Sequence, residues 1–481
     1  MARVSTLTFD RGTLILHPPP KGSEWAQFVQ WDERIEKFRL PAHQYRNFLE
    51  AMRKGGIDVK DDARHFQELQ LPTPEIQPFL HQQQALHAWK QAGRRGVVVL
   101  PTGSGKTILA QLVMHSTPRS TLICVPTLDL MHQWYAGLLK TFPEAQVGLL
   151  GGGSKDDTPI LVSTYDSAAI HAERLGNQYA LHIYDECHHL PTDFYQVISD
   201  YSIAPYRLGL TATLERTDGA HERLTHLIGP TVFKRTPEQL SGGVLSPFKE
   251  VQIKVSLSPE ERQEYDRLIE ERNRFLKDQN INLSSLQGWQ QFVKQSARSQ
   301  AGRGAMLAHR SAREIAFGTS GKLRVLSDLL SKHLGERTVI FTDDNATVYK
   351  ISEQFLIPAI THQTPVKERH ATLERFRSGD YPVIVTSRVL NEGVDVPEAS
   401  IGMVLSGTAT QREYIQRLGR ILRRKEGKEA ILYEVISEGT SEERVSERRR
   451  GVEEPKKPPT PIKGLEQGTL DLNTSVSWED L

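Results

Sequence analysis

The sequence has little cysteine and no long hydrophobic run. Cys124 and Cys187 are the two cysteines among 481 residues, and neither has a CxxC spacing. This argues against a disulfide framework and against a zinc site built on cysteine, and it favours a reducing compartment. Nowhere do about 18 apolar residues run together, and the first residues lack the apolar segment of a secretion signal. We therefore expect a soluble cytoplasmic protein.

The sequence also lacks an excess of charge of either sign. Lys and Arg total 60 and Asp and Glu total 59, so the formal net charge is +1. The composition therefore predicts no polyanionic partner, and any surface for a nucleic acid has to be local. A chain of this length fits several domains better than one.

Short apolar segments alternate with longer helix-like stretches twice along the chain. The first series runs from Val97 to Leu214 and the second from Val339 to Tyr433. This alternation is typical of parallel sheets, so we expect an α/β fold with two lobes in tandem. Between the two series, a charged stretch without strand signals predicts a helical insertion, in which Ser258 caps a helix that begins with Pro259.

The segments at the two ends complete the expected domain organisation. The first 75 residues combine strand-like and helical segments and predict a small α+β domain. The last residues are too polar and too rich in proline to bury a core. The expected domains are an N-terminal domain at 1–75, a first lobe at 76–240, a second lobe at 241–450 with an insertion at about 258–316, and a disordered tail at 451–481.

A glycine-rich loop stands between the strand that ends at Leu100 and a helix-like segment that begins near Lys106. Its glycines let backbone N–H groups point at phosphate oxygens, and the helix N-terminus adds partial positive charge. Lys106 is expected to reach the outer phosphates, and the Thr107 hydroxyl is expected to ligate Mg²⁺. A plain glycine turn is the alternative. The predicted ATP-binding residues are Thr102, Gly103, Ser104, Gly105, Lys106 and Thr107.

Two acidic residues, Asp185 and Glu186, follow the fourth apolar segment of the first series. By themselves, such acids more often belong to a solvated turn. Downstream of a phosphate-binding loop, the first acid can hold Mg²⁺ and the second can polarise the attacking water. We assign these roles to Asp185 and Glu186 respectively.

The second lobe contains two arginines three residues apart, Arg420 and Arg423, shortly after Gln416. This spacing places both arginines on one face of a helix, from which they can reach a γ-phosphate bound to the other lobe. An exposed basic helix is the alternative. We expect Gln416, Arg420 and Arg423 to take part in catalysis.

From Leu80 to Ile436, the order and spacing of these motifs resemble those of superfamily 2 helicases, which have two RecA-like lobes. The resemblance implies that Gln84 reads the adenine and that the segment 211–213 couples hydrolysis to movement. Contacts with a nucleic-acid strand are implied for Thr127, Gln133 and Thr164. Contacts with the nucleotide are implied for Gly393 and Asp395.

A narrower resemblance is to the archaeal and bacterial forms of the xeroderma pigmentosum group B (XPB) helicases. It rests on segments near Asp10 and Trp31, on the insertion and on the segment 214–219. It implies a damage-recognition-like N-terminal domain, a thumb-like insertion, 3′-to-5′ polarity and a loop that helps to open duplex DNA. Arg216 and Asp218 match this loop, but Thr217 replaces its glutamate, which admits translocation along a duplex without strand separation.

The insertion carries a run of basic residues with no acidic residue between them. Such a cluster is the electrostatic signature of a nucleic-acid surface that the balanced net charge conceals. Just upstream, Trp289 and Phe292 can stack on bases or hold the helices together, and packing is favoured. The expected DNA contacts are Lys294, Arg298, Arg303, Arg310 and Arg313.

Together these features predict a DNA helicase or translocase that uses ATP and Mg²⁺ and acts in DNA repair. One alternative is a duplex translocase or an ATP-gated clamp that recruits a nuclease without processive unwinding. Another is an RNA helicase, because the motor motifs contact chiefly the backbone. In the tail, the segment 467–472 resembles peptides that bind the replication sliding clamp, with an inert linker as the alternative.

Overall fold

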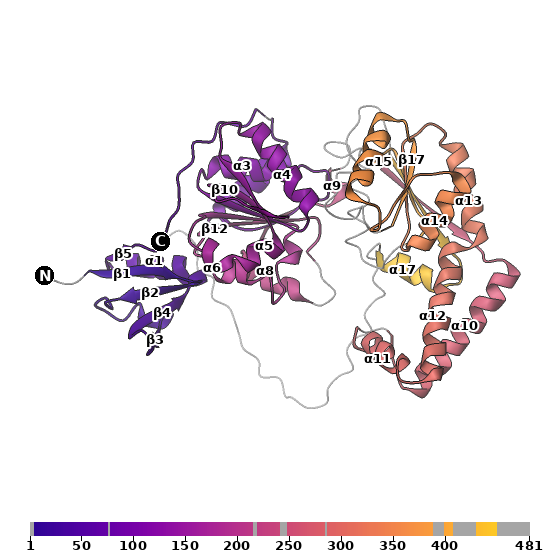
Figure 1. Ribbon diagram of the computed structural model, residues 1–481, viewed down its shortest axis with the longest axis horizontal. Coiled ribbons are helices and arrows are strands. Elements are labelled where there is room, and N and C mark those ends of the chain that lie inside the picture. The colour runs from indigo at the N-terminus through magenta and orange to yellow at the C-terminus, as the bar shows by residue number, and fades with distance from the viewer. Residues whose placement is uncertain are drawn as a thin grey trace, which may run out of the picture.

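Figure 1 shows the computed structural model as three bodies in a row: a small N-terminal domain, a first α/β lobe, and a second α/β lobe from which a helical arm projects. The structure describes residues 4–75, 77–214, 219–240, 248–283, 286–387, 399–406 and 430–449. Within these ranges, no helix is long and apolar enough to cross a membrane.

The N-terminal domain is a five-stranded sheet with one α-helix, in the order β3-β4-β2-β1-β5. Neighbouring strands are antiparallel except β1 and β5, which are parallel. Alternate residues of β2, Leu14 and Leu16, are fully buried in one core with Phe48 of the helix. The elements are β1 Ser5–Asp10, β2 Thr13–His17, β3 Gln30–Asp32, β4 Lys37–Pro41, η2 Ala42–Gln44, α1 Tyr45–Lys54 and β5 Val59–Asp61.

The first lobe is an eight-stranded sheet in the order β13-β6-β12-β11-β7-β10-β8-β9, parallel except for the β8–β9 hairpin. Its strands are β6 Arg95–Val99, β7 Thr121–Val125, β8 Val147–Gly151, β9 Ser154–Lys155, β10 Ile160–Thr164, β11 Leu181–Asp185, β12 Tyr206–Thr211 and β13 Thr231–Lys234. Its helices are α2 Leu80–Gln91, α3 Lys106–Ser116, α4 Leu128–Thr141, α5 Tyr165–Ile170, α6 Ala172–Leu175, α7 Val197–Asp200, α8 Leu224–Leu227 and α9 Pro237–Leu240.

The central strands β7, β10 and β11 are buried at every position because helices cover both faces of the sheet. Val98 and Ile123 pack in a core with α2, α3 and α4, whereas Val97 and Cys124 pack in a second core with α5, α7 and α8. Successive residues of a strand point to opposite faces, so each strand serves both cores. Buried Cys124 is therefore a core residue, with the pKa of its thiol raised by burial.

The second lobe is a six-stranded parallel sheet in the order β14-β19-β18-β15-β17-β16. Its strands are β14 Phe248–Val255, β15 Thr338–Phe341, β16 Ala359–Ile360, β17 Val383–Thr386, β18 Ile401–Val404 and β19 Ala430–Ser437. Its helices are α13 Ser320–Lys332, α14 Asn345–Phe355, α15 Val366–Ser378 and α17 Ser441–Arg449. The two parallel-sheet lobes confirm the α/β class expected from the sequence.

The arm consists of α10 Pro259–Asp278, α11 Leu286–Ser296 and α12 Gln300–Gly318. As predicted, Ser258 caps α10: its hydroxyl accepts a hydrogen bond from the Glu261 amide at 3.2 Å, and the Glu261 carboxylate accepts one from the Ser258 amide at 3.0 Å. The helix α12 buries a row of alanines, including Ala308 and Ala312, which lie in one cluster with Tyr265 of α10. Small side chains on this row allow the two long helices to lie close together.

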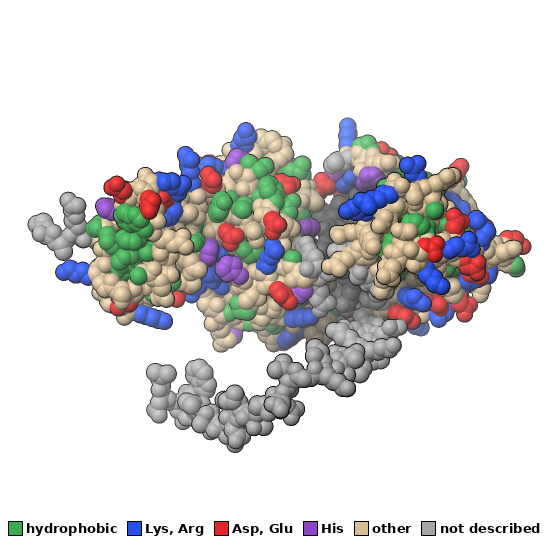
Figure 2. Space-filling model, turned by 90° about the horizontal axis from the view of Figure 1, so that it is seen from below, with side chains coloured by type: hydrophobic (Ala, Val, Ile, Leu, Met, Phe, Trp, Pro, Cys, Tyr) green, Lys and Arg blue, Asp and Glu red, His purple; other side chains and the backbone are tan. Residues whose placement is uncertain are grey.

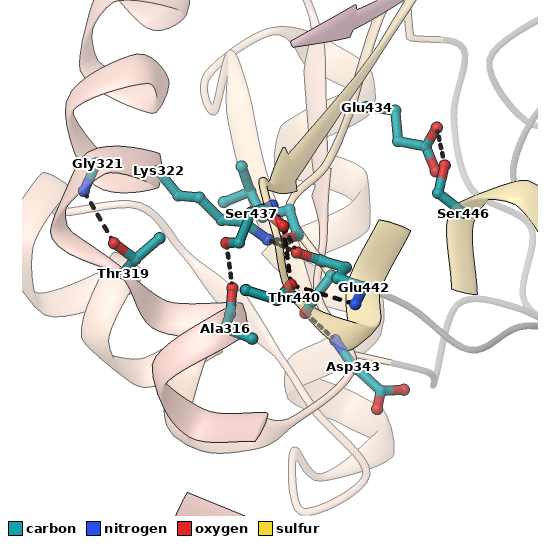
Figure 3. A network of polar contacts seen from close by, with 12 residues as sticks. Ala316, Thr319, Gly321, Lys322, Asp343, Glu434, Ser437, Thr440, Glu442 and Ser446 are labelled. Carbon is teal, nitrogen blue, oxygen red and sulfur yellow. Dashed lines mark hydrogen bonds and ion pairs between the residues drawn. The ribbon is translucent and has the colours of Figure 1, made fainter. Parts of the chain in front are cut away.

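Buried polar contacts tie the base of the arm to the second lobe (Figure 3). The Lys322 ammonium, at the start of α13, lies 2.6 Å from the Glu442 carboxylate of α17, and both side chains are almost fully buried. The Glu442 carboxylate also accepts from the Ser437 amide at 2.9 Å, and the Ser437 hydroxyl donates to the Ala316 carbonyl of α12. The end of β19 is thereby joined both to the arm and to α13.

Candidate nucleotide site and nucleic-acid interface

The glycine-rich loop lies between the end of β6 and the first residue of α3, Lys106, as the sequence predicts. Gly103 and Gly105 both have a φ of 82°, a left-handed conformation that favours glycine. The Thr102 hydroxyl is buried and has no hydrogen-bond partner within the described ranges. Because buried polar groups are normally paired, this hydroxyl is suited to meet an oxygen of a bound nucleotide. Thr107, in the first turn of α3, is exposed to solvent.

Residues at the start of α2 hold this loop by hydrogen bonds. The buried Gln82 amide donates hydrogen bonds to the carbonyls of Ser104 at 3.3 Å and Gly105 at 3.1 Å. His81 is also buried, and its Nε2 lies 2.9 Å from the same Ser104 carbonyl. A Cβ at Gly105 would collide with the Gln82 amide, so the contact itself requires glycine there.

Gln84, which we expect to read the adenine, points to another side of α2, and its role at the base stays a prediction. Its side chain is exposed and accepts a hydrogen bond from the Arg235 guanidinium at 3.3 Å. Two residues along a helix turn the side chain by about 200°, so Gln82 and Gln84 cannot share a face. Gln82 is the glutamine that contacts the loop. The sequence contains three consecutive glutamines, and their helical phase was the missing information.

The two acids at the end of β11 lie beside the loop. The Lys106 ammonium is 3.8 Å from the Glu186 carboxylate and donates to the Leu100 carbonyl at 3.3 Å. Asp185 is buried, and its carboxylate accepts hydrogen bonds from the Trp134 indole at 2.8 Å and the Glu186 amide at 3.0 Å. Burial, together with the charge of Glu186, raises the pKa of Asp185 to about 6.

Trp134 is a site residue that the sequence analysis did not assign. It is 1 % exposed and belongs to α4, the helix that follows the expected strand-contacting residue Thr127. Its indole N–H favours the ionised form of Asp185, because a hydrogen bond to a carboxylate stabilises its charge. Trp134 and Asp185 are far apart in the chain, so their contact cannot be predicted without the fold.

The acids also contact the end of the neighbouring strand β12. The Thr211 hydroxyl donates to the Thr213 carbonyl at 2.7 Å and lies 3.4 Å from the Glu186 carboxylate. The His188 imidazole Nδ1 is 3.0 Å from that hydroxyl and 3.5 Å from the carboxylate. The segment 211–213 is therefore in direct contact with the residue assigned to the attacking water.

Of the three residues expected to contact a strand, Thr127 and Thr164 stand at helix starts in the first lobe and Gln133 lies within α4. Thr127 caps α4 by accepting from the Leu130 amide at 3.2 Å, and Thr164 caps α5 by accepting from the Ser167 amide at 3.2 Å. Both follow neighbouring parallel strands, β7 and β10, so they lie at the same edge of the sheet. Gln133 is exposed on α4.

The basic residues of the arm divide into two groups. Lys294, Arg298, Arg303 and Arg310 are exposed, and Arg310 pairs with Glu314 at 3.0 Å. Arg313 instead pairs at 2.7 Å with Asp343, whose side chain is 3 % exposed, and its guanidinium lies 5.0 Å from the Phe317 ring centre. The structure thus gives Arg313 a role in anchoring the arm. On the face in Figure 2, basic and acidic side chains are interspersed over the second lobe and its arm.

The two aromatic residues of α11 lie in an aromatic cluster with His309 of α12. Phe292 is fully buried, and its ring centre lies 5.8 Å from that of Trp289 and 6.0 Å from that of His309. Trp289 is 38 % exposed and lies 5.4 Å from His309. The packing interpretation is confirmed for Phe292. Burial, reinforced by Arg272 and Arg313, lowers the pKa of His309 to about 4, so the cluster holds a neutral imidazole.

An ion pair bridges the two lobes at the start of α4. The Arg369 guanidinium of α15 lies 3.3 Å from the Asp129 carboxylate in the first turn of α4. Their side chains are 14 % and 25 % exposed. Several expected site residues lie outside the described residues, and with them the tail segment 467–472: Arg216, Asp218, Gly393, Asp395, Gln416, Arg420 and Arg423.

Three family models match the chain. Residues 7–63 match the xeroderma pigmentosum group B helicase damage recognition domain, residues 75–216 match the type III restriction enzyme res subunit, and residues 321–425 match the helicase conserved C-terminal domain. Fold and site together define a superfamily 2 helicase with two RecA-like lobes. The chain belongs to the XPB family of these helicases.

Membership in the XPB family rests on curated relatives as well. The chain is 38 % identical to the "DNA 3′-5′ translocase XPB2" of Sulfurisphaera tokodaii, over 89 % of this chain and 96 % of that protein. It is 30 % identical to the "DNA 3′-5′ helicase XPB" of Mycobacterium tuberculosis, over 72 % of this chain and 58 % of that protein. The solved helicase domain of Pyrococcus furiosus Hef has a TM-score of 0.54 at 18 % identity, covers 78 % of this chain and 98 % of its own, and bears on the fold alone.

Proposed function

We propose that this chain is an ATP-dependent DNA helicase or translocase that moves 3′ to 5′ and acts in DNA repair. The observation that carries the proposal is the ATP site of an XPB-family chain: a glycine-rich loop with Lys106 next to Asp185 and Glu186. The DNA substrate and the polarity follow the names of its relatives, one of which matches over nearly its whole length. A repair role is favoured by the match of residues 7–63 to a damage recognition domain.

Mg²⁺ fits the residues present at the site. Thr107 offers a hydroxyl and Asp185 a carboxylate, both of them hard oxygen ligands that Mg²⁺ prefers. A buried carboxylate with a raised pKa gains from a nearby cation, which offsets the burial that disfavours its charge. When bound, Mg²⁺ would neutralise charge on the nucleotide phosphates. Thr107 and Asp185 are the residues that would hold it.

The roles of the other residues in ATP hydrolysis follow from their positions around the glycine-rich loop. Lys106 reaches the outer phosphates from the start of α3, and Glu186 orients and polarises the attacking water. Its contact with Thr211 gives a direct route by which a change at the γ-phosphate alters the segment 211–213. From the second lobe, Gln416, Arg420 and Arg423 complete the site, and Gly393 and Asp395 contact the nucleotide, when the lobes close.

Along the nucleic acid, we assign the strand contacts to Thr127, Gln133 and Thr164 of the first lobe, with further backbone contacts by exposed Lys294, Arg298, Arg303 and Arg310 of the arm. Arg216 and Asp218 belong to the loop that opens duplex DNA in relatives. Thr217 stands where that loop has a glutamate, and this substitution favours duplex translocation over strand separation as a second mode of action.

Two protein partners extend this proposal. A nuclease is the partner expected if the motor remodels DNA without processive unwinding. A sliding clamp is the partner expected from the segment 467–472, which carries a glutamine followed by two leucines. Substitution of Leu470 and Leu472 by alanine should abolish clamp binding, measured by pull-down with purified clamp, and unchanged binding would rule the peptide out.

The function is tested by ATP turnover with different nucleic acids. Initial rates are measured with single-stranded DNA, duplex DNA and RNA of one length and sequence, with Lys106→Ala as the inactive control. We expect stimulation by DNA that is lost in the variant. Stimulation by duplex DNA with no strand displacement would identify a duplex translocase, whereas stimulation by RNA alone would refute the DNA assignment.

A further inference from the structure

The N-terminal domain lies against the first lobe through a polar and apolar contact. The Arg46 guanidinium of α1 donates to the carbonyls of Gly93 at 2.8 Å and Pro205 at 3.3 Å in the first lobe. Ile203 of the lobe is buried in the core of the N-terminal domain. A Cβ at Gly12 would collide with the Tyr201 ring, so the two bodies approach closely there.

Three metal-ligating side chains meet at this junction. His43 belongs to η2 of the N-terminal domain, Asp200 is the last residue of α7, and His226 belongs to α8. One ligand atom of each lies within 4.8 Å of the other two. The two imidazole rings are 5.1 Å apart and meet edge to face at 73°. The ligands thus come from both bodies, two from the lobe and one from the domain.

The distances between the three ligand atoms are close to those found around a bound transition metal. With metal–ligand bonds of 2.0–2.1 Å, tetrahedral ligand atoms lie roughly 3.3 Å apart. The ligand atoms therefore need to approach one another by up to about 1.5 Å, which side-chain rotation can supply for groups that are exposed or half-buried.

The donor set selects the kind of metal. Two imidazoles and one carboxylate suit zinc and its neighbours, whereas Mg²⁺ and Ca²⁺ require oxygen ligands. All three ligands line a groove of about 1360 Å³ between the two bodies, which leaves room for a fourth ligand such as water.

We propose that His43, Asp200 and His226 bind one zinc-type divalent metal ion that fastens the N-terminal domain to the first lobe. Because its ligands come from both bodies, the ion stabilises their contact and fixes the orientation of the domain on the motor. Removal of the metal loosens the contact without touching the ATP site. The site therefore stands apart from the proposed function and can be tested without ATP or DNA.

The test is metal binding to the full-length, metal-stripped chain. Co²⁺ is titrated and followed by its visible absorption, with Zn²⁺ as a competitor and millimolar Mg²⁺ present throughout. We expect one Co²⁺ per chain, a band typical of four-coordinate Co²⁺, and its displacement by one equivalent of Zn²⁺. The exposed position of His226 makes His226→Ala a variant that keeps the fold, and its affinity should fall at least about ten-fold.

Matched variants decide where the ion binds. Asp200→Asn should weaken Co²⁺ binding as His226→Ala does, whereas His370→Ala, which removes an exposed histidine from the second lobe, should leave it unchanged. Zn²⁺ should raise the Tm of the wild-type chain and should not raise that of His226→Ala. Absence of stoichiometric Co²⁺ binding in the wild-type chain, or equal affinity in wild type and His226→Ala, would overturn the proposal.

Discussion

Trp134 connects the helix that begins at the expected strand contact to the carboxylate assigned to Mg²⁺ through one hydrogen bond. It belongs to α4, whose first turn follows Thr127, and its indole holds the Asp185 carboxylate at 2.8 Å. A movement of α4 that accompanies strand binding therefore reaches the carboxylate assigned to Mg²⁺ directly. We infer that Trp134 is a positioning residue that acts through Asp185.

Trp134→Phe should shift the acid limb of the pH–rate profile. In its proposed role Asp185 holds Mg²⁺ as a carboxylate, so activity should fall as pH falls through its pKa of about 6. Loss of the indole donor removes a contact that favours the charged form, so the pKa rises and the acid limb moves to higher pH. The variant should lose more activity at pH 6 than at pH 8. Superimposable profiles of kcat/KM against pH would contradict this role.

Gln82 and Gln84 form a natural pair of test and control. Gln82→Ala removes one hydrogen bond from each of two loop carbonyls, worth on the order of 0.5–1.5 kcal/mol apiece, while Ser104 keeps its contact with His81 and Gly105 keeps the Leu109 amide. We expect the KM for ATP to rise about ten-fold in Gln82→Ala. Gln84→Ala, on the exposed face, should change KM less than two-fold. The reverse order would restore the assignment made from the sequence.

Single residues were predictable where the signal is local. Lys106 follows the glycine-rich loop, and Asp185 and Glu186 stand at the end of a strand, so none of them needs knowledge of helical phase, and the structure places them together. Trp134 was not predictable as a partner of Asp185, because the fold alone joins their two elements. Arg313 looked like part of one basic run until its contact with Asp343 distinguished it from its exposed neighbours.

Among the elements, α13 and α17 depend on one buried ion pair. The Lys322 and Glu442 side chains are 1 % and 3 % exposed, so neither charge is solvated once its partner is lost. Lys322→Met should destabilise the second lobe by about 3–5 kcal/mol, because it leaves a buried carboxylate uncompensated. Hydrogen exchange of β18 and β19 measures this loss.

A double variant separates charge from packing at the same place. Lys322→Met with Glu442→Leu removes both charges and keeps apolar volume, and it should recover most of the lost protection. Protection as low as in the single variant would mean that the Ser437 and Leu405 contacts of the pair, and not its charge, stabilise the lobe.

The elements themselves were largely predictable. The strands are continuous apolar runs because both faces of each sheet are covered, and the cap at Ser258 is visible as a local sequence pattern. The tie between Ser437 and Ala316 at the base of the arm was not predictable, because it connects the end of β19 to the end of α12.

At the scale of the whole molecule, the two lobes are linked by Arg369 and Asp129. Arg369→Ala removes a bridge between partly buried charges, worth on the order of 1 kcal/mol, and should lower DNA-stimulated ATP turnover about five-fold by disfavouring lobe closure. The exchange variant, Arg369→Asp with Asp129→Arg, should regain most of the rate. Equal loss in the single and exchange variants would argue against a bridge.

The order of the three bodies was predictable from the sequence, because each has its own pattern of strands and helices. Their contacts were not. His43, Asp200 and His226 lie in three elements of two bodies, and nothing local to any of them indicates the other two. A site shared between domains leaves no local sequence pattern, so it cannot be predicted before the fold is known.

The proposed 3′-to-5′ movement along DNA can be measured directly. Streptavidin is bound to a biotin at the 3′ or the 5′ end of single-stranded DNA, and its ATP-dependent displacement is measured with the wild-type chain and Lys106→Ala. A 3′-to-5′ motor should displace streptavidin from the 5′ end, and only the wild-type chain should do so. Displacement from the 3′ end, or from neither end on a DNA that stimulates ATP turnover, would contradict it.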